Sequence, residues 1–305
     1  MSLRPRRLGF AMVAVLWAVV VVGTLALATA LAGRDAFDAG RNRVNAARAF
    51  WLANACAERT RASIDSTLNR SDAVPARLWR HLDSVVLSDP LSTGTACDVH
   101  LEADGARLDV NVASADELVR LFTALGRPDA DALAAAIIDW RDADDDPLPG
   151  GAESAWYAGQ GRPVPRSAPL ADDAELARIR GFEDGMARQV LSVESGPISI
   201  ANAAGPVLAA VPGFTDEAVA AMLATRVQGG EVDDLLALAS TLSSAARDSL
   251  VAHYQDVSRL TTLDPVGWIV TATGRSGHPS VVATVELRVV RTNRRAQVMR
   301  RRVRA

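Results

Sequence analysis

The chain opens with MSLRPRRLGFAMVAVLWAVVVVGTLALATALAG, residues 1–33, and this stretch determines how the rest is organised. No charged side chain occurs between Leu8 and Gly33, a run of 26 residues. A helix of that length is about 39 Å long at ~1.5 Å per residue, more than the ~30 Å hydrocarbon core of a bilayer requires. Three arginines precede the run: Arg4, Arg6 and Arg7. Because positive side chains stay on the cytoplasmic side, the sequence predicts one membrane helix with a cytoplasmic N-terminus.

The residues alone leave three alternatives for the processing of this segment. A signal peptidase would cut after Ala28-Thr29-Ala30, although the apolar run is much longer than the ~7–15 residues of a typical secretory signal. An uncleaved signal anchor would keep the segment whole. The third site is Gly9-Phe10, because a basic leader ending in Gly before a long apolar helix resembles the class III signal of type IV pilins and type II secretion pseudopilins. In those families a prepilin peptidase cuts after the Gly and the helix is retained.

The helix is predicted to continue beyond the membrane, over residues 34–68. Apolar side chains recur there at three- and four-residue steps between faces that carry Arg and Asp: Phe37, Val44, Ala47, Trp51 and Ala55. This spacing indicates an amphipathic helix with one apolar stripe. A linker after a simple membrane anchor would more often be polar and rich in Gly or Pro.

Strand patterns flank a long helical region. Residues 97–110, CDVHLEADGARLDV, alternate in polarity and predict a β-hairpin with its turn at Asp104-Gly105. Near the C-terminus, DPVGWIVTATG and HPSVVATVELRVVRTN predict two strands joined by GRSG, and RRAQVMRRRVRA predicts a third. Residues 113–258 are rich in Ala and Leu with helical periodicity. We therefore expect an α+β fold, in which a long N-terminal helix packs on an antiparallel sheet that carries a large all-α, helix-hairpin-helix-like insertion.

An acidic stretch interrupts this helical region at residues 139–153, DWRDADDDPLPGGAE. Four of its carboxylates have the spacing found in calcium-binding loops: Asp142, Asp144, Asp146 and Glu153. Pro147 occupies the position at which an EF-hand needs Gly, and no clear helix is expected after the stretch, so it is not an EF-hand. A solvated acidic turn is the alternative. Because crowded carboxylates repel one another without a counter-ion, we instead predict a structural calcium ion.

Helix-hairpin-helix-like segments raise a second possible function. Residues 108–122, 169–182 and 198–214 share a polar or small N-cap and a short apolar helix, and the last two add a Gly-containing turn. Such turns can present backbone N–H groups to a phosphate, so a membrane-anchored periplasmic module that binds DNA for uptake is the alternative function. Phosphate binding normally needs Lys or Arg near the turn, whereas VPGFTDE is acidic and the net charge of the chain is -3. We expect no nucleic-acid partner.

The two cysteines and the C-terminal arginines each allow more than one interpretation. Cys56 and Cys97 match neither a redox pair nor a zinc cluster, and they would either form one disulfide outside the cytoplasm or stay unpaired in the core. Residues 288–304 contain eight Arg and no acid. We favour the solvated face of an edge strand over contact with anionic lipid or an acidic partner.

Catalytic patterns are absent from the sequence. It contains no G-x-S-x-G, no H-E-x-x-H and no P-loop, and its four histidines are scattered without metal-ligand spacing. An all-carboxylate calcium site suits structure better than water activation. We expect no enzymatic activity.

Three blocks, in this order, resemble the K-type minor pseudopilin of the type II secretion system: IIDWRDADDDPLPGGAESAWY, PLADDAELARIRGF and ISIANAAGPVLAAVPGF. The fifth residue after the prepilin peptidase site is Ala14, whereas most pilins carry Glu there, and this absence is typical of the K-type subunit. The family's N-T-A triplets appear here only as Asn111-Val112-Ala113 and Asn202-Ala203-Ala204. A signal-anchored scaffold without a pilus role is the plainer alternative.

The resemblance implies a specific role and location. The chain would be a single-pass inner-membrane protein with a periplasmic C-terminal domain, placed at the tip of the pseudopilus, where it helps initiate assembly. Its partners would be the I- and J-type minor pseudopilins, contacted mainly through the long helix, and the prepilin peptidase. Calcium would bind in the helical domain, at the four carboxylates named above. Lesser ligand candidates, for example for a second ion, are Asp139, Asp145 and Asp172.

The expected domain boundaries follow from the segments described above, taken with the resemblance. In chain order, we expect a leader, a transmembrane helix, the periplasmic half of the long helix, the first part of the sheet, the helical insertion and the C-terminal strands: 1–9, 10–33, 34–68, 69–112, 113–258 and 259–305.

Overall fold

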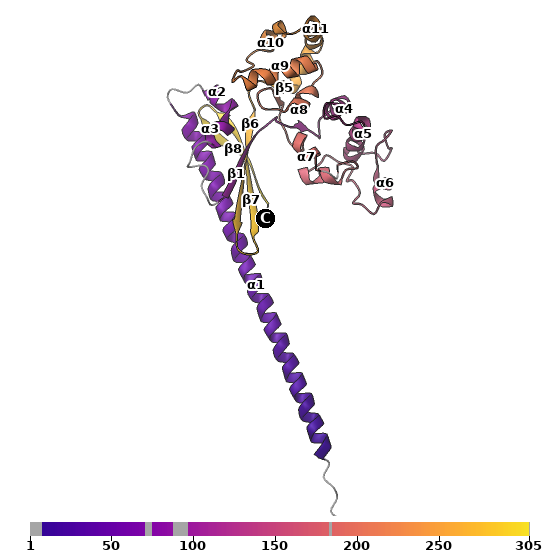
Figure 1. Cartoon of the computed structure of the whole chain (residues 1–305), viewed down its shortest axis with the longest axis vertical. Coiled ribbons are helices and arrows are strands. Elements are labelled where there is room, and N and C mark those ends of the chain that lie inside the picture. The colour runs from indigo at the N-terminus through magenta and orange to yellow at the C-terminus, as the bar shows by residue number, and fades with distance from the viewer. Residues whose placement is uncertain (1–7, 71–74, 88–96, 183–184, 305) are drawn as a thin grey trace, which may run out of the picture.

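A single long helix carries the rest of the molecule (Figure 1). The computed structural model describes residues 8–70, 75–87, 97–182 and 185–304. Helix α1 runs without a break from Leu8 to Leu68, which confirms the predicted continuation of the membrane helix. Gly9 and Phe10 lie in its first turn, and the preceding leader lies outside the described residues. The apolar first half of α1 is exposed in the isolated chain and is long enough to cross a membrane, so it fits a single-pass anchor.

The second half of α1 packs on a four-stranded antiparallel sheet, and the predicted α+β fold is confirmed. The strands follow the order β1-β6-β7-β8. Their bounds are Cys97–Ala103 (β1), Gly267–Ser276 (β6), Val281–Thr292 (β7) and Arg295–Arg304 (β8). The three C-terminal strands therefore confirm the sequence prediction. The β6–β7 pairing runs from Gly267↔Val290 to Ser276↔Val281.

Small side chains bring α1 close to the sheet. Ala49, Ala53 and Ala57 are fully buried on the helix face that meets the strands. Opposite them, a Cβ atom on Gly274 of β6 would overlap the Ala49 carbonyl oxygen. Further along, larger side chains such as Ile64 fill the space between helix and sheet. Glycine at this strand position is thus required by the close approach of the helix backbone.

Two short helices close the far end of this core. Helices α2 (Pro75–Arg80) and α3 (Leu82–Leu87) follow α1. Trp79 is buried and its indole N–H donates to the Pro265 carbonyl at 2.7 Å, while the Trp268 indole N–H donates to the Trp79 carbonyl at 2.8 Å. The structure also joins Cys56 of α1 to Cys97 of β1 by a disulfide, with a Cα–Cα distance of 6.6 Å.

The predicted hairpin at residues 97–110 is wrong. Strand β1 pairs with β6, whereas β2 (Leu108–Asp109) pairs in parallel with β3 (Leu191–Ser192). The chain does turn at Gly105, which has a φ of +89°, but it turns away from the sheet. The Asp104 carboxylate is held by Arg288 of β7 and by the Gly196 N–H, and these contacts direct the chain into the insertion.

The helical insertion consists of two halves, each closed by a short parallel strand pair. The first half lies between β2 and β3 and contains α4 (Ala115–Ala124), α5 (Ala130–Arg141), α6 (Ser154–Gly159), the 3-10 helix η1 (Asp173–Arg178) and α7 (Ala187–Val190). The second lies between β4 (Ile198–Ser199) and β5 (Thr261–Thr262) and contains α8 (Gly205–Ala209), α9 (Asp216–Val227), α10 (Leu235–Thr241), α11 (Ser244–Ala252) and α12 (Tyr254–Leu260).

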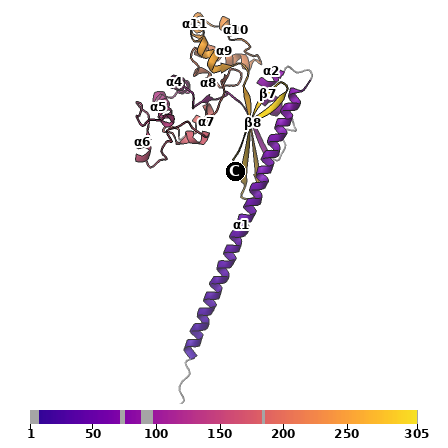
Figure 2. The same cartoon turned by 180° about the vertical axis from the view of Figure 1, so that it is seen from behind.

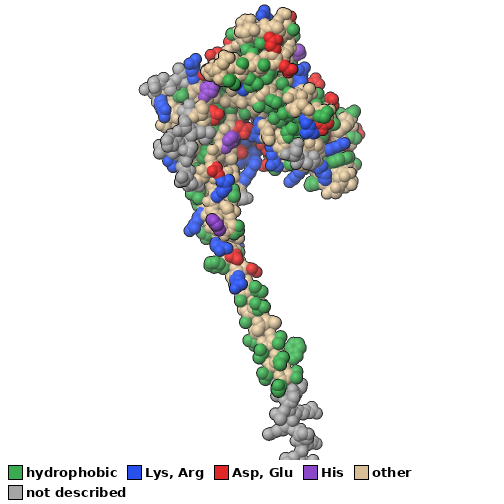
Figure 3. Space-filling model, in the orientation of Figure 1, with side chains coloured by type: hydrophobic (Ala, Val, Ile, Leu, Met, Phe, Trp, Pro, Cys, Tyr) green, Lys and Arg blue, Asp and Glu red, His purple; other side chains and the backbone are tan. Residues whose placement is uncertain are grey.

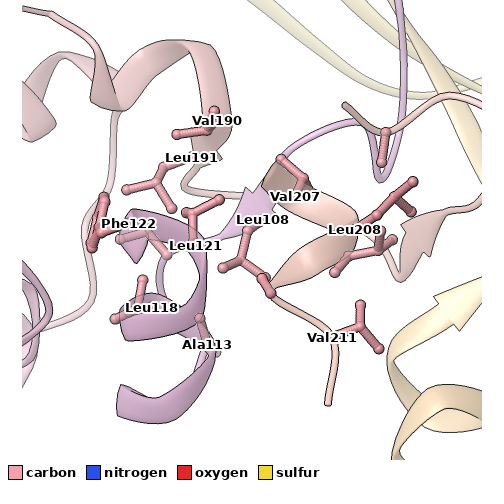
Figure 4. Close-up of a cluster of buried hydrophobic side chains, with 14 of the residues drawn as sticks. Leu108, Ala113, Leu118, Leu121, Phe122, Val190, Leu191, Val207, Leu208 and Val211 are labelled. Carbon is pink, nitrogen blue, oxygen red and sulfur yellow. The ribbon is translucent and has the colours of Figure 1, made fainter. Parts of the chain in front are cut away.

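The two halves share one apolar core. Leu118, Leu121 and Phe122 of α4 meet Val207 and Leu208 of α8 in one buried cluster (Figure 4). Each half also uses one arginine in the same way, as the predicted internal repeat would suggest. Arg141 at the end of α5 donates to the carbonyls of Val110 and Ala113, and Arg226 near the end of α9 donates to those of Ile200 and Ala203.

Candidate metal centre

The acidic stretch forms a bend between α5 and α6. Helix α5 ends at Arg141 because Asp142 adopts an extended conformation, with φ -79° and ψ 174°. After Pro147, Gly150 takes a φ of +84°, and its Cα lies so close to Ala132 that a Cβ would be only 3.1 Å from the Ala132 Cβ. At Gly151 a Cβ would overlap the Asp139 carboxylate. The two glycines therefore let the bend return to the end of α5.

A short helix follows the bend, contrary to the sequence prediction. Helix α6 spans only Ser154–Gly159, with Glu153 extended at its N-cap position. Its aromatic residues are held from several sides: Tyr157 packs edge-on against Trp140, and its hydroxyl accepts a 3.0 Å bond from the Arg180 N–H. Six residues are too few to establish a helical period in the sequence, and packing of Tyr157 supplies the stability instead.

Three carboxylates converge where α5, the bend and α6 meet. Asp139 comes from the last turn of α5, Asp142 from the position after it and Glu153 from the start of α6. Each offers an oxygen atom, and these atoms all lie within 4.8 Å of one another. Asp139 and Glu153 are buried, and Asp142 is half-buried. Asp142 and Glu153 belong to the predicted ligand set, while Asp139 was a lesser candidate.

The structure departs from the predicted set at the remaining positions. Asp144 and Asp146 lie exposed on the bend, where the Asp146 N–H donates to the Asp144 carboxylate at 3.0 Å. Asp145 is also exposed. Asp172 caps η1 and pairs with Arg304 at 2.8 Å, away from the cluster. The reason is Pro147, which directs the bend away from the loop path that would turn alternate carboxylates inward.

The cluster contains unpartnered buried oxygens. Both Glu153 carboxylate oxygens and Asp142 Oδ1 are buried without a hydrogen-bond partner, and among the described residues no arginine forms an ion pair with any of the three acids. The Leu148 N–H donates to both Asp139 oxygens at 3.2 Å. Burial, and then the charges of Asp139 and Asp142, raise the pKa of Glu153 to about 7. Burial is also the main cause that raises the pKa of Asp139 and of Asp142.

This donor set fits a hard divalent cation. Carboxylate oxygens are the preferred ligands of calcium, and the cluster offers neither the thiolates nor the imidazoles that favour zinc. A bound cation would satisfy the orphaned oxygens and remove the repulsion among three buried acids. Asp139, Asp142 and Glu153 are therefore the residues that would hold calcium here.

Loop spacing made Asp139 a lesser candidate, whereas the structure places it beside Asp142 and Glu153. Asp139 and Asp142 are three residues apart, which places them on neighbouring positions of a helix end rather than in a loop. The helical pattern of residues 130–141 and the two glycines that follow were the available signals.

The helix-hairpin-helix-like turn within residues 198–214 contributes to packing between the helices of the insertion. Gly213 has a φ of +93°, and a Cβ there would crowd His253 of α11–α12. The following helix α9 begins with Asp216 and Glu217, and its Thr215 cap bonds the Ala218 N–H. These acids oppose phosphate binding at that helix end.

Comparison with known proteins gives a family match over the segment that contains the first half of the insertion. Residues 95–193 match the family model for the type II secretion system (T2SS), protein K. This part of the chain is similar to the protein K family. The matched segment begins just before β1, ends just after β3 and includes the three converging carboxylates. The resemblance to a K-type minor pseudopilin inferred from the sequence is therefore confirmed.

The architecture extends this similarity to most of the chain. A chain in the crystal structure of the GspK-GspI-GspJ complex from the enterotoxigenic Escherichia coli type 2 secretion system superposes with a TM-score of 0.59 at 14% identity. The match covers 87% of this chain and 99% of that chain. No curated protein sequence matches. At this identity the superposition establishes a shared fold.

The raised pKa of Glu153 predicts how stability depends on pH without metal. Between its ordinary value of 4.5 and about 7, the folded chain holds a proton that the unfolded chain has released, so stability falls as pH rises through this window. We expect the melting temperature of metal-free protein to be lower at neutral pH than near pH ~5, and Glu153→Gln to flatten this dependence. Thermal melts followed by circular dichroism measure it.

Asp144→Asn is the matched control, because Asp144 lies exposed outside the cluster. The same pH dependence in wild type and Glu153→Gln would contradict the assignment.

Proposed function

We propose that this chain is the K-type minor pseudopilin that occupies the tip of a type II secretion pseudopilus and helps initiate its assembly for the export of folded proteins. The observation that carries the proposal is a protein K domain mounted on one continuous helix, whose first half is apolar and long enough to cross a membrane. The proposed role is structural, and it depends on where the helix places the domain.

The position of the insertion supports a place at the tip. The chain leaves the sheet after Ala103 and returns at Gly267, and these ends are bonded to each other through the Asp104 N–H and the Gly267 carbonyl at 2.8 Å. Gly274, at the other end of β6, lies against Ala49 on the membrane side of the sheet. The insertion therefore projects from the end away from the apolar segment, where its bulk would block a further subunit (Figures 1 and 3).

Helix α1 also supports helical partners. Phe37, Val44 and Trp51 follow each other at seven-residue intervals and are 71%, 51% and 64% exposed. Ala49 and Ala53, on the other side of α1, face the sheet. An apolar stripe with a seven-residue repeat is suited to packing against another helix. Since the solved complex joins GspK with GspI and GspJ, we propose the I- and J-type minor pseudopilins as the partners of this stripe.

The compartment and processing complete the proposal. Cleavage by prepilin peptidase after Gly9 would leave the helix with Phe10 as its first residue, its N-terminus on the cytoplasmic side of the inner membrane and its head in the periplasm. The Cys56–Cys97 disulfide supports an oxidising compartment for the head. Calcium bound by Asp139, Asp142 and Glu153 would link the end of α5 to the start of α6 in the inserted domain.

The partner assignment predicts a specific cross-linking pattern in cells. A photo-reactive amino acid at Val44, on the exposed stripe of α1, is expected to cross-link to the I- or J-type minor pseudopilin, as detected by mass spectrometry of the adducts. The matched control is Val227, which is 88% exposed but lies at the end of α9. Cross-links from position 227 but not from 44, or from neither, would contradict the assignment.

The calcium assignment predicts which carboxylates matter. Millimolar calcium is expected to raise the unfolding free energy of metal-free protein by RT ln(1 + [L]/Kd), about 2.7 kcal/mol at a hundredfold excess over Kd. Asp142→Asn removes an oxygen donor of the cluster and is expected to abolish most of this gain. Asp144→Asn, its neighbour on the exposed bend, is expected to retain it. Calorimetric melts with and without calcium measure the difference, and an equal loss in both variants would reject the assigned ligands.

A further inference from the structure

The sheet and the insertion have separate cores. The buried apolar side chains between α1 and the sheet form one cluster, and those of the insertion form another, with no residue in common. Figures 1 and 2 both show the sheet lying between α1 and the first half of the insertion. The contact between the outer face of the sheet and the insertion is therefore made by other groups.

A bulge in β8 turns a row of arginines toward the insertion. The register with β7 shifts between Arg288 and Val289, which leaves Met299 without a partner. Before the bulge, Ala296 and Val298 pack toward α1. After it, Arg301 faces α1, where it bonds Asn54 and approaches Glu58 at 3.7 Å. The residues between and beyond these positions consequently point to the opposite face: Arg300, Arg302 and Arg304.

These arginines pair with acids of the insertion. Arg302 bonds Glu194 at 2.6 Å, and Arg300 pairs with the same carboxylate. Arg304 bonds Asp172 at 2.8 Å. Glu194 lies in the linker that joins the two halves of the insertion, and Asp172 precedes η1. The interpretation of this whole strand as a solvated face was wrong for these three arginines.

Two further pairs extend the row to the point where the chain enters the insertion. Arg288 of β7 bonds Asp104 at 2.9 Å, and the Asp104 carboxylate is fully buried. Arg107 pairs with Glu102 of β1 and with Asp173 of η1, the latter at 3.1 Å. Asp104 also accepts the Gly196 N–H at 2.7 Å, so the entry point and the linker are held together.

The charges in this contact nearly cancel. Arg300 also meets Glu286 of β7 at 3.3 Å, so five arginines face six carboxylates across the row. Arg300, Arg302 and Arg304 are thus already paired with acids of the same molecule. Figure 3 shows basic and acidic side chains together in the recess beneath the overhanging insertion. This arrangement does not favour a free docking surface for an acidic partner or anionic lipid.

A second contact ties the other half of the insertion to α2. Arg80 pairs with Glu231 at 2.9 Å and also with Asp233 and Asp264, and the Asn202 side chain donates to the Arg80 carbonyl at 3.0 Å. The Arg80 side chain is only 10% exposed, whereas Arg302 and Arg304 are 27% and 49% exposed. Salt screens exposed pairs much more strongly than buried ones, so the pairs of Arg302 and Arg304 respond to ionic strength more than the Arg80 contact and the Arg288–Asp104 pair, whose carboxylate is fully buried.

We propose that the arginine row of β7 and β8 is an electrostatic latch that sets the angle of the inserted domain on the sheet. The latch opens on screening or charge removal, while the Arg80 contact remains as the pivot and both cores stay folded. The latch thereby controls whether the insertion is held against the outer face of the sheet or released from that face.

Hydrogen exchange of the full chain in detergent micelles tests this inference. The reporters are the amides of Gly196 and Asp104, which donate to the Asp104 carboxylate and to the Gly267 carbonyl where the insertion meets the sheet. We expect the double variant Arg302→Gln/Arg304→Gln to accelerate their exchange about tenfold, the factor that corresponds to ~1.4 kcal/mol. Amides of α5 and of the β6–β7 pairing should keep their protection.

The matched control is Arg291→Gln/Arg295→Gln, which removes the same charge from the same hairpin. Neither arginine has an ion pair within the residues described. Raising the salt concentration on the unmodified chain provides a test that needs no variant, and it should accelerate the same amides. Unchanged exchange in both experiments would overturn the latch, and so would equal acceleration of reporters and core amides, since that result means global unfolding.

Discussion

The close contact between α1 and the sheet is the constraint on which the rest of the structure depends. It requires alanine on the buried face of the helix and glycine at position 274, because any larger side chain would hold the two backbones apart. It covers one face of the sheet with the upper half of α1 and leaves the lower half bare, available to lipid. It also fixes which end of the sheet points away from the membrane. Since the insertion leaves from β1 and returns to the neighbouring strand β6 at that end, its position follows from the same contact.

The inserted domain holds its acidic side chains in two different electrostatic environments. Three carboxylates are gathered at the α5–α6 bend without a cationic side chain among the described residues that pairs with them, which leaves buried oxygens that a bound cation would satisfy. Against the sheet, by contrast, the carboxylates of the insertion meet arginines one by one. We propose that a cation bound at the first cluster would stiffen the domain internally, and that the second set of pairs orients the domain on the sheet.

Much of this architecture follows from the sequence because it rests on periodic patterns. The uncharged run, the helix over residues 34–68 and the three C-terminal strands each have a clear local signal, and each forms where it was expected. The apolar stripe predicted on that helix is nevertheless exposed in the chain, and the face that carries Ala49, Ala53 and Ala57 is buried against the sheet instead. What the sequence did not reveal depends on contacts between distant segments. Leu108 and Asp109 alternate like a returning strand, yet they pair with residues more than eighty positions away. Asp139 joins the cluster of Asp142 and Glu153 through the geometry of a helix end. From the sequence, the β8 arginines were expected to be solvated on an edge strand. In the structure, the bulge near Met299 turns alternate ones toward the insertion.

The central claim is that α1 is the retained helix of a pseudopilin and not a cleaved signal or an unprocessed anchor. Intact-mass and N-terminal peptide analysis of the chain purified from the membranes of its own cells tests this claim most directly. We expect a mature protein whose first residue is Phe10, produced by a cut after Gly9 that depends on prepilin peptidase. A mature chain that begins after Ala30, or one that retains the basic leader, would contradict it.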